Sequence, residues 1–171
     1  MRIDRLDPGS KAEIDALAAL LVECVDDGAS LNFLAPLAPA TARAWWSAAL
    51  ADPLARTWVA RDERGRVVGC VRLLLAAQQN GSHRGEVSKL LVSVGSRRLG
   101  YAGALLSTLE AWAAEHGRHR LVLDTEAGSP AEALYEGHGW TKAGVIPDFA
   151  STTRGHLAPA SFWTKGLGAA T

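Results

Sequence analysis

The stretch from Glu86 to Ala113, EVSKLLVSVGSRRLGYAGALLSTLEAWA, constrains the fold of this chain more than any other. It begins as a run of valine and leucine, which is typical of a buried strand, and continues through a short basic loop. Beyond the loop, apolar residues recur with a 3.6-residue period and would share one face of a helix. That face consists of Ala102, Leu105, Leu106, Leu109, Trp112 and Ala113. The stretch therefore predicts a strand, a glycine-bearing loop and an amphipathic helix in direct succession.

The loop of this stretch has the composition of an anion-binding site. The first amide groups of a helix have no intrahelical partner, and they lie at the positive end of the helix dipole. Gly100 and Gly103 would let a ligand approach the backbone, while Arg97 and Arg98 suit a pyrophosphate. The alternative is an ordinary connection with solvated arginines. The glycine patterns of nucleotide hydrolases and of dinucleotide-binding proteins are both missing from the sequence.

Two motifs carry a resemblance to a known family. Residues 97–102, RRLGYA, match R/Q-x-x-G-x-G/A, the coenzyme A pyrophosphate loop of the GNAT superfamily of N-acetyltransferases. Residues 131–140, AEALYEGHGW, are similar to the second signature of that superfamily, A-x-x-L-Y-x-x-x-G-F/W, and they also follow a predicted strand. The chain thus resembles GNAT enzymes. The segments VSKLLV, LVLDT and AEALY are similar to the subgroup that contains the tabtoxin-resistance acetyltransferase.

The alternation of predicted strands and helices favours an α/β or α+β fold. The resemblance implies the GNAT fold, a mixed central sheet splayed between two parallel strands and flanked by helices, and we expect one domain over residues 1–171. The strands are predicted at 2–6, 57–61, 67–75, 86–92, 120–124, 140–146 and 160–165, with a loop at 147–156. A helix begins after a capping box of Ser10 and Glu13, a second is capped by Thr41 and ends at Asp52, and a third begins at Pro130.

The resemblance also implies acetyl-CoA as cosubstrate and assigns residues to it. The pantetheine arm would pair with the strand end at Leu90, Leu91 and Val92, like an added strand. An amide there would polarise the acetyl carbonyl. The pyrophosphate would meet the helix N-terminus, where the assigned residues are Arg97, Arg98, Leu99, Gly100, Tyr101, Ala102 and Gly103. Ser129 is assigned to the cofactor as well.

Acetyl transfer to an amine requires a base for the ammonium and an acid for the leaving thiolate. By the resemblance, Tyr135 is the general acid; a buried structural tyrosine is the alternative. Glu86 and Asp124 are the candidate bases, with a water relay also open. Asp124 is preferred because it follows an apolar run, where burial would raise its pKa. Either carboxylate could instead be solvated or form an ion pair.

The expected acceptor site includes Phe33, Trp46 and His83. In the resembling family, the region before and within the second helix closes over the acceptor substrate. Trp45 and Trp46 are adjacent, so one ring faces the core and the other is free to line the site; core packing of both is the alternative. His83 belongs to a polar loop, where it could equally be a surface residue. The histidines have no metal-ligand spacing, and we expect no metal.

The function expected from these features is acetyl-CoA-dependent transfer to an amine of a small molecule, with antibiotics and toxins among the candidates, by direct attack in a ternary complex. The alternatives are acetylation of a protein N-terminus or lysine, and a non-catalytic coenzyme A-binding module. Eighteen basic and eighteen acidic residues cancel, which argues against nucleic-acid or membrane partners. We expect a cytoplasmic protein with reduced Cys24 and Cys70, and leave a homodimer open.

Overall fold

The computed structural model describes residues 1–6 and 10–168. Within them the chain alternates strands and helices, as the α/β prediction requires. In order these are β1 (Arg2–Arg5), α1 (Lys11–Asp26), α2 (Pro39–Ala51), β2 (Ala55–Arg61), β3 (Val67–Leu75), η1 (Gln79–Gly81), β4 (Arg84–Val92), η2 (Val94–Ser96), α3 (Tyr101–Glu115), β5 (Arg120–Glu126), α4 (Pro130–Gly137), β6 (Thr141–Ser151) and β7 (Leu157–Gly166). None of the helices in these residues combines the length and apolarity needed to cross a bilayer.

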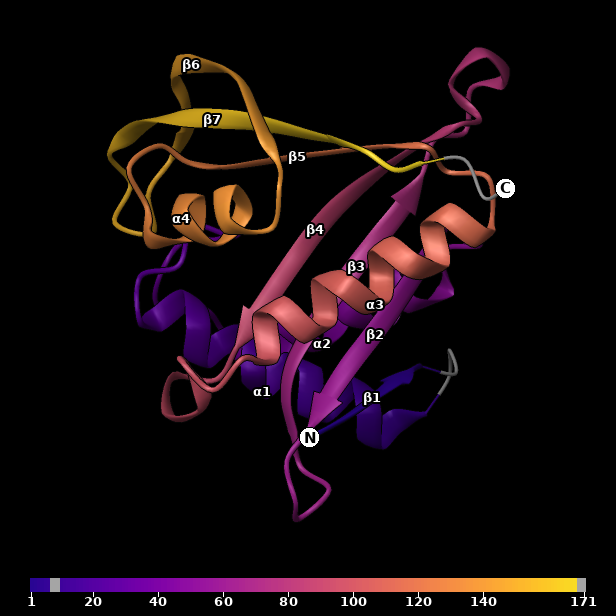
Figure 1. Ribbon diagram of the computed structural model, residues 1–171. Helices are drawn as coiled ribbons and strands as arrows, with labels where there is room; N and C mark the ends of the chain where they lie inside the picture. The colour runs from indigo at the N-terminus through magenta and orange to yellow at the C-terminus, as the bar shows by residue number, and fades with distance from the viewer. Residues whose placement is uncertain (7–9, 169–171) are drawn as a thin grey trace.

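The strands form one sheet in the order β1-β2-β3-β4-β5-β7-β6 (Figure 1). Among the described strands, β4 and β5 make the parallel pair, while the other neighbours are antiparallel. Parallel neighbours need a crossover, and α3 provides it, as the stretch after Glu86 predicts. The mixed sheet expected from the sequence is thus confirmed.

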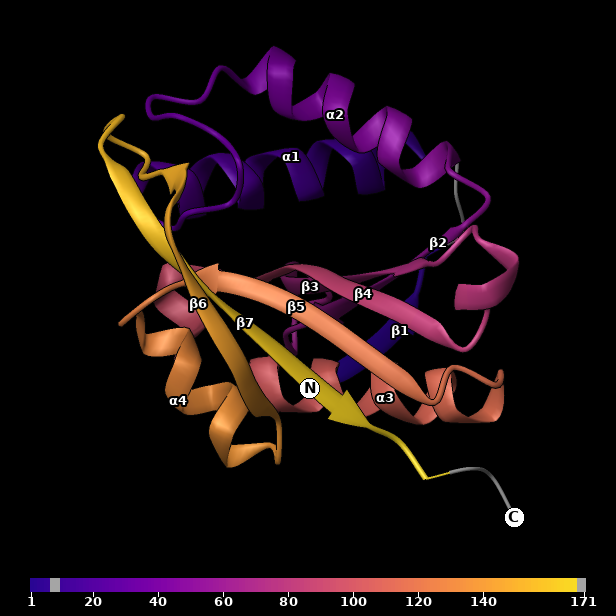
Figure 2. The ribbon, with the colours of Figure 1, turned by 90° about the horizontal axis from the view of Figure 1, so that it is seen from above.

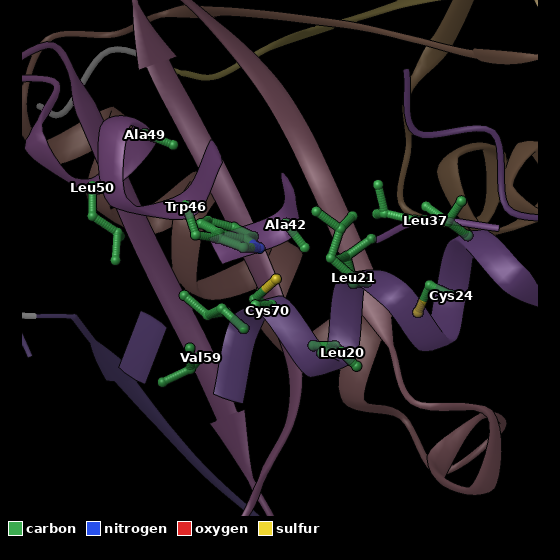
Figure 3. Packing of buried hydrophobic residues seen from close by; sticks show 14 of the residues in the cluster. Leu20, Leu21, Cys24, Leu37, Ala42, Trp46, Ala49, Leu50, Val59 and Cys70 are labelled. Atoms are coloured by element: carbon green, nitrogen blue, oxygen red, sulfur yellow. The ribbon is translucent and has the colours of Figure 1, made fainter. Parts of the chain in front are cut away.

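Helices cover both faces of the sheet. Figure 2 shows α1 and α2 on one face and α3 and α4 on the other. Each pair of helices closes over its own apolar cluster. The α1–α2 cluster includes Leu21, Trp46 and Cys70, which are labelled in Figure 3. The α3–α4 cluster includes Leu109 and Trp163. Both faces of the central strands are therefore buried, which explains their long apolar runs.

The N-terminal helices begin where local signals place them, with one correction. Ser10 is the N-cap of α1, and its Oγ accepts a hydrogen bond from the Glu13 backbone N–H at 3.4 Å, as predicted. The expectation that Thr41 caps α2 is wrong, because α2 begins at Pro39 after Ala38. Proline has no N–H and a helical φ, so it suits the first helical position better than a side-chain cap suits Thr41.

The C-terminal hairpin is longer than predicted. The first half of the loop expected over residues 147–156 is strand, since β6 reaches Ser151, and the second half connects it to β7, which begins at Leu157. The register shifts between Ile146 and Ala150, and Asp148 within this irregularity has a φ of 50°. A proline is tolerated at such a bulge on an edge strand, so Pro147 does not end the strand.

We predict that Leu109→Ala lowers the free energy of unfolding by about 3 kcal/mol, because it leaves a cavity under the sheet. Leu109 is 0% exposed, whereas Leu157 is 65% exposed. The same truncation at Leu157 is the matched control, and it should change stability by less than about 0.5 kcal/mol. Urea denaturation of the two variants tests this. Equal losses would contradict the assignment of Leu109 to the core.

Candidate functional site

The site is built around the divergence of β4 from β5. The two strands pair from Arg84–Arg120 to Glu86–Val122, and no later residues of β4 and β5 pair within the described chain. Both strands continue, β4 beside β3 and β5 beside β7, so they separate as they run (Figure 1). From Val87 onwards the β5-facing edge of β4 is therefore without a strand partner. Such an edge can pair with an extended ligand, and Leu90, Leu91 and Val92 lie on it.

A bulge interrupts β4 beside this edge. Cys70 of β3 pairs with Leu91, and Arg72 pairs with Ser88, so β4 advances three residues while β3 advances two. Lys89 lies within this irregularity and has a φ of 52°, in the left-handed region that a non-glycine residue seldom adopts. The bulge redirects the local side chains, and Lys89 is the residue most affected.

The loop after β4 is held by the end of α1. Glu23 accepts hydrogen bonds from the Ser93 hydroxyl at 2.9 Å and the Val94 backbone N–H at 2.7 Å. The Arg97 guanidinium pairs with the Asp27 carboxylate at 2.7 Å. Arg97 is thus a loop anchor in this state, not a free cation. Arg98 is exposed and has no ion pair with any described residue, so it is the arginine of the pair that is available to an anion.

The N-terminus of α3 presents free amides, as expected from the sequence. Gly100 has a φ of 85° and is the N-cap, and the first α-helical hydrogen bond runs from the Ala104 N–H to the Gly100 carbonyl at 3.1 Å. The backbone N–H groups of residues 101–103 have no partner in the described chain. A Cβ added to Gly103 would meet His138 Nε2 at 2.9 Å, and the predicted approach of a ligand to this glycine stays a prediction. Its small size admits the imidazole of His138.

Tyr135 lies on α4 with its ring in the apolar cluster below the sheet. It is 6% exposed, and its ring centroid is 5.9 Å from Trp140 and 6.2 Å from Trp163. Burial, and to a lesser extent the negative charge of Asp124, raises the pKa of Tyr135 to about 12. The phenol therefore stays protonated at neutral pH, as a proton donor must. Ser129 is the N-cap of α4, and its Oγ lies 3.3 Å from the Thr125 hydroxyl.

The expectation that Asp124 is buried is wrong. Side chains alternate along β5, and Leu121 and Leu123 occupy the buried positions, so Asp124 faces the other side and is exposed. Glu86 is exposed for the same reason, beside buried Val87. Both carboxylates nevertheless lie within electrostatic range of Lys89, where they oppose the lowering of its pKa that burial and the charge of Arg72 cause. Which carboxylate acts as base stays a prediction.

The structure places Trp45, not Trp46, beside the site. Trp46 is 0% exposed and packs with Ala42 and Leu50 in the α1–α2 cluster (Figure 3), so its expected place in the acceptor site is wrong. Successive helical residues point about 100° apart, and the period of the buried residues of α2 selects Trp46 for the core. Trp45 instead meets Phe33 edge-on, with ring centroids 5.9 Å apart.

Sequence reasoning did not include Lys89 in the site. The Lys89 ammonium lies 4.9 Å from the Trp45 ring centroid and 5.8 Å from that of Phe33. The sequence feature that could have indicated Lys89 is the presence of a lysine within the apolar run VSKLLV. His83, by contrast, is exposed at the joined end of the strand pair, where its carbonyl accepts from the Arg120 N–H. It lies six residues before Lys89, about 20 Å along the strand.

The described residues bring together no group of three or more histidine, cysteine, aspartate or glutamate side chains suited to a metal ion. Cys24 and Cys70 are both buried free thiols. Burial raises the pKa of Cys24 to about 11, and it also raises the pKa of Cys70. Protonated, buried thiols are poor nucleophiles, so the groups with suitable chemistry are the amides of α3, Tyr135 and the carboxylates.

We predict that Tyr135 contributes to alkaline sensitivity. Its ordinary pKa is 10.0 and its pKa in the folded chain is raised to about 12, so its stabilising effect is complete below pH 10 and is lost as the pH rises toward 12. Between pH 8 and pH 11, the wild type should lose about 1 kcal/mol more stability than Tyr135→Phe. Urea denaturation at both pH values measures this difference. Equal losses in the two proteins would contradict a buried, protonated phenol.

Known proteins share this fold. The chain is 24% identical to a ribosomal-protein-alanine N-acetyltransferase from Brucella melitensis, with a TM-score of 0.78 over 98% of this chain and 100% of that one. It is 22% identical to a phosphinothricin acetyltransferase from Sinorhizobium meliloti solved with acetyl-CoA, with a TM-score of 0.80 over 98% and 90%. An aminoglycoside 6'-acetyltransferase type Ii is 21% identical, with a TM-score of 0.77 over 100% of both chains.

These likenesses establish a common fold. The decisive match is to the model of the acetyltransferase (GNAT) family, which covers residues 21–140 and therefore more than half of the chain. That segment contains the divergent strands, the α3 N-terminus and Tyr135. GNAT acetyltransferases use acetyl-CoA, and the chain is accordingly an acyltransferase. The protein belongs to the GNAT family of N-acetyltransferases.

Proposed function

We propose that this N-acetyltransferase moves the acetyl group of acetyl-CoA to an amine of a small molecule, by direct attack in a ternary complex. The observation that carries the proposal is the divergence of β4 from β5, with free helix amides at the end of β4 and aromatic residues over the bulge. The open strand edge suits a long, amide-bearing arm, and the helix N-terminus suits a pyrophosphate.

In this proposal the coenzyme A follows the strand and then the helix. Amide groups of its pantetheine arm pair with the backbone of Leu90–Val92, and the pyrophosphate oxygens accept from the N–H groups of residues 101–103. Arg98 supplies positive charge, while Arg97 keeps the loop attached to α1 through Asp27. Ser129, at the α4 N-terminus, lies on the other side of the divergence.

The reaction itself needs proton transfers from the acceptor nitrogen, before and after attack, and to the leaving thiolate. The acceptor ammonium loses a proton to Asp124, Glu86 or a relayed water, and the neutral amine then attacks the thioester carbonyl. A backbone N–H of β4 stabilises the developing oxyanion. The C–S bond breaks, Tyr135 protonates the leaving thiolate, and the nitrogen of the new amide gives up its extra proton, which restores the phenol of Tyr135. The raised pKa of Tyr135 keeps the phenol protonated before transfer, but it also makes Tyr135 a weaker acid than a solvated tyrosine.

A small acceptor is favoured over a peptide by the segment between α1 and α2. It brings Phe33 over Lys89 and against Trp45 on α2, so aromatic side chains cover this part of the site. Relatives of this fold are named for small acceptors, phosphinothricin and aminoglycoside, but also for a ribosomal protein. Transfer to a protein N-terminus or lysine is therefore the second candidate. The biological role that we propose is resistance to an antibiotic or a tabtoxin-like toxin, so these compounds belong among the acceptors to be screened.

We predict that Gly100→Asp abolishes acetyl-CoA binding, because it puts a carboxylate where the pyrophosphate would lie. Gly117→Asp is the matched control. Gly117 also has a positive φ, 72° compared with 85° at Gly100, and an added Cβ would have no atom within 4 Å. It lies beyond the opposite end of α3, away from the proposed pyrophosphate position. At a hundredfold excess over Kd, the ligand should stabilise the wild type and Gly117→Asp by about 2.7 kcal/mol. Thermal unfolding measures the shift. A full shift in Gly100→Asp, or none in the wild type, would contradict the cofactor site.

We predict that Tyr135→Phe lowers kcat about 100-fold while acetyl-CoA affinity stays within twofold, because only the proton donor is lost. Release of free thiol with a panel of amines measures kcat. Trp163→Phe alters the packing around the same ring and controls for structural effects, so it should lower stability and change kcat only a few-fold. A Tyr135→Phe enzyme with kcat within threefold of the wild type would remove Tyr135 from the mechanism.

A further inference from the structure

Lys89 is a buried residue whose ammonium still reaches solvent and has no counter-ion in the described chain. The residue is 8% exposed, yet its ammonium forms no ion pair or hydrogen bond with any residue among 1–6 and 10–168. Two aromatic rings lie near it instead, with centroids 4.9 and 5.8 Å from Nζ. Ring faces compensate a buried charge only in part, and a partly desolvated ammonium gains most from an anion.

None of the neighbouring charged side chains provides the anion that the Lys89 ammonium lacks. Arg72 is also buried, but its guanidinium pairs with the Asp52 carboxylate at 2.9 Å, and its own positive charge disfavours the Lys89 ammonium. Glu86 and Asp124 are close enough to act on Lys89 electrostatically, but neither comes within the 4.0 Å of an ion pair. Both are exposed and therefore hydrated. Lys89 is left as the largely buried cation of the site, on the same side of the sheet as two carboxylates.

This arrangement is complementary to a molecule that carries both charges. An anionic group at Lys89 would lie under Phe33 and Trp45 and beside the unpaired edge of β4. An ammonium on the same molecule would then be attracted by Glu86 or Asp124, the two candidate bases. The bulge at Lys89 is what makes this possible, because it redirects the lysine from the normal strand alternation.

We propose that Lys89 binds a carboxylate of the acceptor, so that the substrates are amino acids or other amines with a nearby carboxylate. This inference rests on the proposed function and makes the acceptor class specific. Lys89 contacts the part of the substrate that does not react, and it orients the amine toward the thioester. A polycationic acceptor would face an unfavourable charge at the same position.

The test compares acceptors in which the carboxylate is replaced by a neutral amide. Thiol release is measured for the common L-amino acids and for their amides, with the wild type, Lys89→Met and Lys89→Arg. We expect kcat/KM of the wild type to be at least tenfold higher for the acid in the best pair, and Lys89→Met to remove that preference. Lys89→Arg keeps the charge and should retain part of it. Lys142→Met is the matched control, because Lys142 lies 5.2 Å from the Trp163 centroid and pairs with Glu132.

A binding measurement separates this inference from the proposed function. Titration calorimetry with the coenzyme A-loaded protein compares N-acetyl-L-amino acids with their amides, which test the anion site without turnover. Tighter binding of the carboxylate that Lys89→Met abolishes supports the site even if no amine is acetylated, in which case the proposed function fails. Acetylation of amines without a carboxylate advantage in either assay overturns the inference and leaves the proposed function standing. The wild-type preference is informative even if Lys89→Met fails to fold.

Discussion

The separation of β4 from β5 after Glu86 and Val122 is the constraint on which the rest of the site depends. A continuous ladder would satisfy every backbone group of β4 internally and leave nothing for a ligand to pair with. Because β5 continues beside β7, it separates from β4. The sheet therefore opens between these two strands, although pairing at their other end keeps it one sheet. At the joined end, a Cβ added to Gly85 would lie 3.4 Å from Cδ2 of Leu121 on β5 and 2.7 Å from Cδ1 of Leu73 on β3. The tight junction and the wide opening thus belong to one strand pair.

Interactions on both faces hold this geometry. Above the sheet, Glu23 of α1 and Asp27, the C-cap of that helix, fix the loop that joins β4 to α3. Below it, α4 packs with Tyr135 against Trp140 and Trp163. The loop, the helix N-terminus and the phenol therefore belong to different elements that a single sheet positions. Loss of packing on either face would move these candidate groups relative to one another, so the stability of the fold and the arrangement of the site are coupled.

Much of the fold could be predicted from local patterns. The 3.6-residue period identified α3, the capping box placed the start of α1, and Pro130 marked the start of α4. Errors occurred where two local signals competed. Thr41 is a good cap, but Pro39 fits the first helical position, and Pro147 indicates a loop, but a bulge on an edge strand accommodates it. At Pro39 the outcome depends on which of two local signals is stronger, and at Pro147 it depends on pairing with β7.

The features of the candidate site also fall into those that the sequence predicts and those that depend on tertiary contacts. The sequence by itself determined the family motifs, the loop and helix that offer amides to an anion, and the tyrosine, because each depends on residues close together in the chain. Only the tertiary structure decided that Trp45 and not Trp46 adjoins the site, that Asp124 is exposed, and that Arg97 is paired with Asp27. Lys89 gains its significance from a bulge and from two aromatic side chains distant in sequence. Burial and pairing are properties of contacts between elements, and no local pattern contains them.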